Sequence, residues 1–129
     1  MEVDIYTPVI SNLIIPCSDV LHEKLYSMIE GFNVATPEVL LILKAQAAQQ
    51  RWHAEKGVKD RADIISLLQF ADIKTDILRD LLNRYDKERL LLEVIRRAVT
   101  ESKIEYRFLG LTYERDGAQL RQFLKETFP

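Results

Sequence analysis

The chain has 129 residues, of which 47% are hydrophobic and 29% are charged, and its formal net charge is −2. This length fits one domain. The apolar content is high enough to form a hydrophobic core, so it excludes an intrinsically disordered protein. The near balance of charge excludes a broad nucleic-acid surface, which requires clustered cations. Charge is nevertheless uneven, because residues 1–36 carry one cation and five acids (1 − 5 = −4) and residues 37–129 carry 17 cations and 15 acids (17 − 15 = +2).

The cellular compartment can be inferred from sequence features that the chain lacks. Cys17 is the only cysteine, so no disulfide can form within the chain, and a reducing compartment is expected. The first ten residues, MEVDIYTPVI, are acidic and lack the cationic segment of a signal peptide. No apolar run approaches the roughly 20 residues that span a bilayer. We therefore expect a soluble, cytoplasmic protein that does not enter a membrane.

The N-terminal quarter of the chain has the pattern of extended structure. β-Branched residues recur between positions 3 and 10, and a short apolar run over residues 12–16 ends in proline. Residues 19–35 fit either a helix or a strand that ends at Gly31, and we favour a short helix or loop followed by a strand. A small β part is thus predicted at this end.

Helical signals begin at Thr36. Thr36 is predicted to be an N-cap, Pro37 the first helical residue and Glu38 a favourable charge at the positive end of the helix dipole. This helix should extend to about His53. Gly57 should then interrupt the helical structure, and a second helix should extend from about residue 59 to residue 70.

Three further helical patterns follow. One begins at Thr75 or Asp76, the next is capped by Asp86, and the last follows Thr112. Residues 104–111 fit either a strand or a helix end, with Gly110 as a helix stop. The predicted fold class is therefore α+β, with a small N-terminal β part followed by a bundle of about five helices in one compact unit.

Two cations on the first predicted helix are candidates for binding an anion. Lys44 and Arg51 are seven positions apart, which is two turns of helix, so both lie on one face. Small residues at 45, 47 and 48 would let another group approach closely. An arginine fork and a lysine point charge suit a polyphosphate. The alternative is a solvated helix face that carries ordinary cations.

Three charged residues open the next predicted helix. Asp60 and Asp63 are three apart and so are neighbours on one face, and Lys59 precedes them. They could organise a binding site, or the carboxylates could complement the helix dipole and form ion pairs with Lys44 or Arg51. Two carboxylates alone make a poor protein site for Mg²⁺.

Taken together, Pro37-Glu38, Lys44-x6-Arg51 and Lys59-Asp60-x2-Asp63-Ile64 resemble the second half of minimal nucleotidyltransferase-like proteins, typified by the AbiE-type toxin. The resemblance covers roughly residues 3–70, and residues 71–129 would be a variable helical tail. It implies triphosphate contact by the two cations of the first helix, site organisation by the three residues that open the second, and Asp4 as a metal ligand. The implied cofactors are Mg²⁺ and a nucleoside triphosphate.

The chain departs from that family at its metal-binding half. No glycine is followed by serine, and no Asp-x-Asp pair occurs. Because those carboxylates fix the metal ions that stabilise charge on the transferred phosphoryl group, the chain alone is predicted to be inactive. An incomplete sheet would also expose an edge that invites another chain to pair with it.

Three functional interpretations follow from the sequence. The preferred one is an inactive nucleotidyltransferase-like protein with a nucleotide- or phosphate-binding half-site, completed by a separate chain that supplies the missing half or by homo-oligomerisation. The first alternative is a helical protein–protein interaction module without a nucleotide role, in which the motif residues form salt bridges. The second is an enzyme that builds its site across a homodimer or from unrelated residues.

Overall fold

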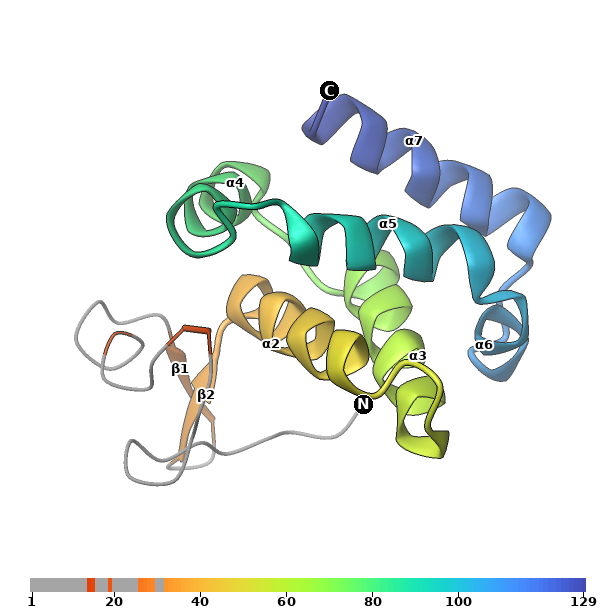
Figure 1. The fold of residues 1–129 in the computed structure, drawn as a ribbon, viewed down its shortest axis with the longest axis horizontal. Helices are drawn as coiled ribbons and strands as arrows, with labels where there is room; N and C mark the ends of the chain where they lie inside the picture. The colour runs from red at the N-terminus through yellow and green to blue at the C-terminus, as the bar shows by residue number, and fades with distance from the viewer. Residues whose placement is uncertain (1–13, 16–18, 20–25, 30–31) are drawn as a thin grey trace.

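The computed structural model describes residues 14–15, 19, 26–29 and 32–129, and this part of the chain is predominantly helical (Figure 1). A short π-helical turn, η1 (Tyr113–Gly117), precedes the last helix. The helices are α2 (Pro37–Gln50), α3 (Glu55–Phe70), α4 (Thr75–Tyr85), α5 (Leu90–Glu101), α6 (Lys103–Phe108) and α7 (Ala118–Thr127). None of the described helices is both long and apolar enough to cross a bilayer.

The predicted α+β class is wrong, because the protein is helical. Strand pairing in the described part of the chain is limited to one antiparallel hairpin, in which β1 (Tyr26–Ile29) pairs with β2 (Phe32–Ala35). A two-stranded hairpin is not independently stable in water, so it does not amount to a β layer. The buried apolar residues come almost entirely from the helices. The segment predicted to be extended over residues 3–16 lies outside the described residues except for Ile14 and Ile15.

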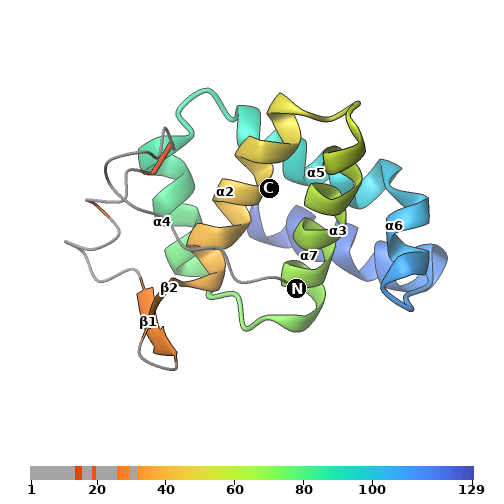
Figure 2. The same ribbon diagram turned by 90° about the horizontal axis from the view of Figure 1, so that it is seen from below.

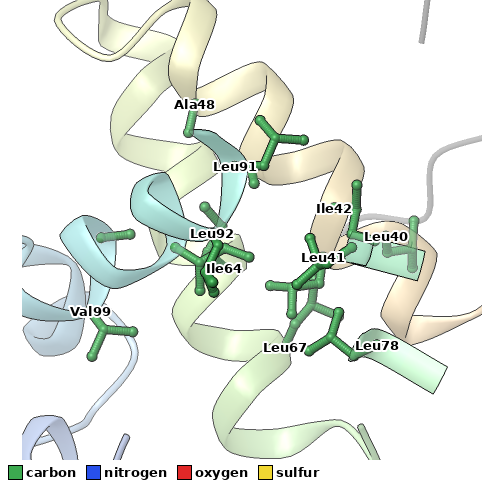
Figure 3. Close-up of a cluster of buried hydrophobic side chains, with 14 of the residues drawn as sticks. Leu40, Leu41, Ile42, Ala48, Ile64, Leu67, Leu78, Leu91, Leu92 and Val99 are labelled. Atoms are coloured by element: carbon green, nitrogen blue, oxygen red, sulfur yellow. The ribbon is translucent and has the colours of Figure 1, made fainter. Parts of the chain in front are cut away.

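Helix α2 forms the centre of the core. Its residues 39–43 are five consecutive aliphatic side chains, and all are buried, so the helix is covered on nearly every side. Figure 2 shows α2 lying between α3 and α4, with α5 packed across it. In Figure 3, Leu41 of α2 lies near Leu67 of α3 and Leu78 of α4. Removing such side chains from water is the main source of stability for this fold.

The turn between α2 and α3 corrects the predicted role of Gly57. Helix α2 ends at Gln50 rather than near His53, and α3 begins at Glu55, so Gly57 lies inside the first turn of α3. A Cβ atom at this position would lie 2.2 Å from the carbonyl oxygen of Arg51 and 2.7 Å from that of Trp52. The glycine therefore permits close backbone contact between the turn and α3, and it does not break the helix.

The predicted cap at Asp86 is confirmed. Its carboxylate accepts hydrogen bonds from the backbone N–H groups of Leu91 (3.0 Å) and Leu92 (2.9 Å), in the first turn of α5. The N-cap position itself belongs to Arg89, which has a left-handed backbone (φ 61°). Asp86 thus satisfies two helix-end amides from a position outside the helix.

At the start of α2, Thr36 takes the predicted N-cap position, but its hydroxyl makes no capping hydrogen bond. Glu38 in the first turn is buried and accepts a hydrogen bond from the backbone N–H of Lys74, just before α4 (3.3 Å). Burial raises the pKa of the Glu38 carboxyl. The N-terminal end of α2 is therefore held by the hydrogen bond between Glu38 and the start of α4, and not by a side-chain cap.

Residues 104–111 form the end of a helix and not a strand, which was one of the two predicted alternatives. Helix α6 stops at Phe108, and Gly110 adopts φ 72°. The N–H of Leu111 then donates to the carbonyl of Tyr106 (2.8 Å). The last helix begins at Ala118, because η1 separates it from the predicted start after Thr112.

Tyr106 attaches α6 to α5. Its side chain is fully buried, and its hydroxyl donates to the carbonyl of Val99 (2.9 Å). Desolvation raises the pKa of Tyr106 to about 12. The Tyr113 ring packs edge-to-face against it, with ring centroids 5.5 Å apart.

Candidate functional site

The residues predicted to bind an anion lie along the contact between α2 and α3, which run antiparallel to one another. Lys44 is in α2, and Arg51 is the first residue after that helix. Asp60 and Asp63 are one turn apart in α3 and are buried. The structure therefore brings together four of the six predicted site residues.

Arg51 and Asp60 form a bidentate pair. Arg51 Nε donates to Asp60 Oδ2 at 2.7 Å, and Arg51 Nη2 donates to Asp60 Oδ1 at 2.8 Å. The Asp60 side chain is 1% exposed, whereas that of Arg51 is 41% exposed. The planar guanidinium fork matches both oxygens of the carboxylate, so it satisfies the buried acid while remaining in contact with solvent.

Lys44 and Asp63 form a second, deeper ion pair. Lys44 Nζ lies 3.0 Å from Asp63 Oδ2, and each side chain is only 10% exposed. Two charges that are removed from water in this way must neutralise each other, because either one alone would be costly to bury. The sequence alternative in which the motif carboxylates pair with the motif cations is therefore what the structure contains.

The other two predicted site residues are Lys59 and Asp4. Lys59 is exposed on the surface of α3. Asp4, the predicted metal ligand, lies outside the described residues. Among the described residues, no three histidine, cysteine, aspartate or glutamate side chains gather as metal ligands.

The local charge balance bears on anion and metal binding. Asp60 and Asp63 each lie against a cation, and both oxygens of Asp60 accept hydrogen bonds from Arg51. A phosphate that approached Arg51 would compete with a buried carboxylate for the same donors. Mg²⁺ and a nucleoside triphosphate therefore stay predictions that rest on the resemblance.

A second cluster next to these pairs was not predicted. Arg61 of α3 forms an ion pair with Glu105 of α6 (3.2 Å) and also donates to the backbone carbonyl of Trp52. The guanidinium carbons of Arg61 and Arg97 lie 4.8 and 4.2 Å from the centroid of the Trp52 ring. This cluster joins α3, α5 and α6 at the end of α2. Its members are scattered along the chain, so no local motif indicated it.

Helix α6 presents the other feature that the sequence did not reveal. Ile104 and Phe108 are one turn apart, and they are 60% and 69% exposed. Lys103 and Arg107 flank them and are also exposed. The intervening Glu105 and Tyr106 point inward and are buried. The sequence of this short segment fits either a strand or a helix end. It therefore could not predict which of its side chains are exposed.

No protein-family model, curated protein or solved structure matched this chain. The resemblance to nucleotidyltransferase-like proteins therefore stays a prediction, as do the roles that it implies for Lys44, Arg51 and Lys59.

Proposed function

We propose that the protein is a helical protein–protein interaction module and that the exposed face of α6 is its contact surface. The observation that carries this proposal is the pair Ile104 and Phe108, two large apolar side chains placed one turn apart in solvent. Exposed apolar side chains at this spacing are the anchors of many helix-mediated contacts. Four of the motif residues, meanwhile, pair with one another, Lys44 with Asp63 and Arg51 with Asp60, which supports a structural role for them.

The way α6 is held supports the proposal. Glu105 forms an ion pair with Arg61, and Tyr106 donates to the carbonyl of Val99, so the inner face of the helix is fixed at two points. A contact surface that is already ordered loses little conformational entropy when a partner binds. The exposed face therefore suits recognition without rearrangement.

The charge on this face indicates the chemistry of the partner. Lys103 and Arg107 flank the two apolar anchors, and the residues of α6 that are exposed include no acid. The complementary partner segment would carry apolar anchors together with carboxylates. An acidic amphipathic helix has this combination.

A displayed library of amphipathic helical peptides would test the proposal. Acidic members should be enriched on the wild-type protein and lost on the double variant Ile104→Ser/Phe108→Ser. The matched control is Phe70→Ser/Leu90→Ser, which removes the two other large exposed apolar side chains of the described part from α3 and α5. Failure to enrich acidic peptides, or equal loss of binding in both variants, would count against α6 as the surface.

Self-association is a related proposal with a distinct outcome. The sequence predicts a homo-oligomer assembled through the N-terminal strands, or completed by a separate chain. Sedimentation velocity of the wild type, the α6 variant and the control would separate the two surfaces. Assembly through α6 should disappear in Ile104→Ser/Phe108→Ser, whereas assembly through the strands should persist.

A nucleotide-binding half-site at Lys44 and Arg51, in an otherwise inactive nucleotidyltransferase-like protein, is the competing proposal. The observation that favours it is the exposure of the Arg51 guanidinium, which solvent reaches even though Asp60 binds it. Calorimetric titration with nucleoside triphosphates, with and without Mg²⁺, would test it. If a phosphate competes with Asp60, Asp60→Asn should strengthen binding and Arg51→Gln should abolish it. Unchanged affinity in both variants would exclude this site.

We also propose a cytoplasmic location. It is supported by the single cysteine, which suits a reducing compartment. Fractionation of cells that express the tagged full chain would test it, and recovery with the membrane or secreted fraction would overturn it.

A further inference from the structure

The first of two adjoining cavities lies between α4, α5 and the C-terminal residues, and the second lies between α5 and α7. They have volumes of about 440 and about 610 Å³ and share Arg96, Phe128 and Pro129 in their walls. Volumes of this size are typical of sites for small molecules.

The walls of these cavities are strongly cationic. The first contains Arg79, Arg89 and Arg96, and its only acid is Glu93. The second adds Arg121 and Lys125 and contains no acid. Together the lining residues carry five cations and one acid (5 − 1 = +4). Since the whole chain has a net charge of −2, the rest of it carries −6 (−2 − 4 = −6). Positive charge is thus concentrated where the surface is hollow.

Helical spacing explains how the cations meet. On α5, Glu93 and Arg96 are three residues apart and so are neighbours on one face, and Arg89 is the N-cap residue just before this helix. Arg121 and Lys125 are likewise one turn apart on α7. Arg79 completes the set from α4. The packing of three helices therefore builds a cluster that no local segment of sequence contains.

Arg96 is held in place at the junction of the two cavities. Its Nη1 donates to Glu93 Oε1 at 2.6 Å, and its Nη2 donates to the backbone carbonyl of Phe128 at 2.8 Å. The guanidinium of Arg121 lies over the Tyr113 ring, 5.2 Å from its centroid. A guanidinium that is already oriented loses less freedom when it binds an anion.

Arg79 and Arg89, by contrast, form no ion pair with any residue that the structure describes. Arg89 also sits at the N-terminus of α5, where the helix dipole disfavours a cation, and it adopts a left-handed backbone. A left-handed non-glycine residue is a local cost that the rest of the fold must offset. Like charges gathered without counter-charges are a further cost, and a bound anion would relieve it.

We propose that these cavities form a binding site for a small molecule that carries at least two phosphate groups. Arginine is the residue best suited to grip a phosphate through paired hydrogen bonds, and four of the five cations are arginines. Two neighbouring cavities that share Arg96 suit a ligand whose charges are spread along its length. Phe128 and Leu124 provide apolar surface beside the charges for an organic portion of the ligand. This site is separate from the α6 surface and from the ion pairs of α2 and α3.

Calorimetric titration of the full chain with orthophosphate, pyrophosphate, inorganic triphosphate and adenosine triphosphate, without added metal, would test the proposal. Pyrophosphate should bind at a one-to-one ratio and more tightly than orthophosphate. If adenosine triphosphate binds more tightly than inorganic triphosphate, the organic portion contacts the apolar wall, and equal affinities assign binding to the phosphates alone. Absence of saturable binding of every probe up to about 10 mM, which corresponds to a negligible affinity, would overturn the proposal.

The variant Arg79→Gln/Arg89→Gln removes two unpaired cations from the first cavity and should weaken pyrophosphate binding by about tenfold or more. The control Lys56→Gln/Arg107→Gln removes the same charge from exposed positions on α3 and α6 that line neither cavity, and should change the affinity by less than about twofold. Lys125→Gln tests the second cavity independently. Equal weakening in the control would show general electrostatic attraction, and undiminished binding in both cavity variants would place the ligand elsewhere; either result would overturn the proposal.

Discussion

Lys44 and Arg51 each lie against a buried carboxylate, whereas Arg79 and Arg89 line an open cavity without an ion pair among the described residues. Lys44 and Arg51 belong to a sequence motif, whereas Arg79 and Arg89 belong to none. The difference shows that charge spacing along one helix does not distinguish a ligand site from an internal ion pair. That distinction depends on which charges the neighbouring helices bring to the same place.

The largest effect is expected where a buried pair is broken. Asp63→Ala removes the carboxylate that lies 3.0 Å from the buried ammonium of Lys44, and this should lower the free energy of unfolding by about 3 kcal/mol or more. The double replacement Lys44→Met/Asp63→Leu removes both charges and keeps apolar volume, so it should be much less damaging. Urea unfolding of the wild type, Lys44→Met, Asp63→Leu and the double variant would measure the coupling, and the same titration of Asp63→Ala would measure the loss. A double variant as unstable as Asp63→Ala would show that packing, and not charge, is at stake.

A smaller loss is expected at Gly57. In an ordinary helix, Gly→Ala stabilises by about 1 kcal/mol, but here a Cβ atom would meet the carbonyl oxygens of Arg51 and Trp52. Gly57→Ala should therefore destabilise by about 2 kcal/mol, because backbone must move to admit the methyl group. Thermal unfolding provides the measurement, and Gly110→Ala serves as a contrast in which the cost comes from the left-handed backbone, since nothing lies within 4 Å of its added Cβ. A gain in stability for Gly57→Ala would contradict the close contact.

Tyr106 should have an effect of about 1 kcal/mol, with a defined dependence on pH. Tyr106→Phe removes the hydrogen bond to the Val99 carbonyl, whose net worth is of that order. The folded-state pKa of about 12 lies above the ordinary value of 10.0, so the phenol ionises first in the unfolded chain. The stability that wild type holds over the variant should thus be constant below pH 10 and fall as the pH rises toward 12. Tyr113→Phe is the matched control, and a stability difference that does not change across this window would contradict the assignment.

The smallest effect is expected in the cavities. Without ligand, Arg79→Gln/Arg89→Gln should leave the free energy of unfolding within about 0.5 kcal/mol of wild type, or raise it slightly, because no ion pair is lost and repulsion is reduced. Added pyrophosphate should stabilise wild type more than this variant. The same urea titrations, with and without ligand, would show both results. A large loss of stability without ligand would mean that these arginines support the fold.

The sequence predicted local features of the structure better than it predicted the fold class. The signals at Pro37, Asp86 and Gly110 are local, and the structure places a helix start, a capping carboxylate and a helix stop there. The fold class was wrong because a local β pattern, such as the one that forms the hairpin of β1 and β2, does not reveal whether a larger sheet surrounds it. The role of Gly57 was wrong because a glycine that ends a helix and one that permits close contact look alike in sequence.

The candidate site shows the same division. Neighbouring positions for Asp60 and Asp63 followed from helical periodicity, and their pairing with Lys44 and Arg51 was one of the alternatives that the sequence left open. The cluster around Trp52 and the cationic cavities could not be predicted, because Arg61, Arg97 and Glu105 meet only through the packing of α3, α5 and α6. Contacts of this kind depend on tertiary structure, which no local pattern encodes.

Trp52 is the only tryptophan in the chain, and two guanidinium groups lie over its indole ring where three helices meet. The protein therefore contains a single intrinsic fluorophore at a junction that exists only in the folded state. Its emission should shift when that junction opens. Because the ring lies outside the walls of both cavities and outside α6, its signal can follow folding while ligands or partners are added elsewhere.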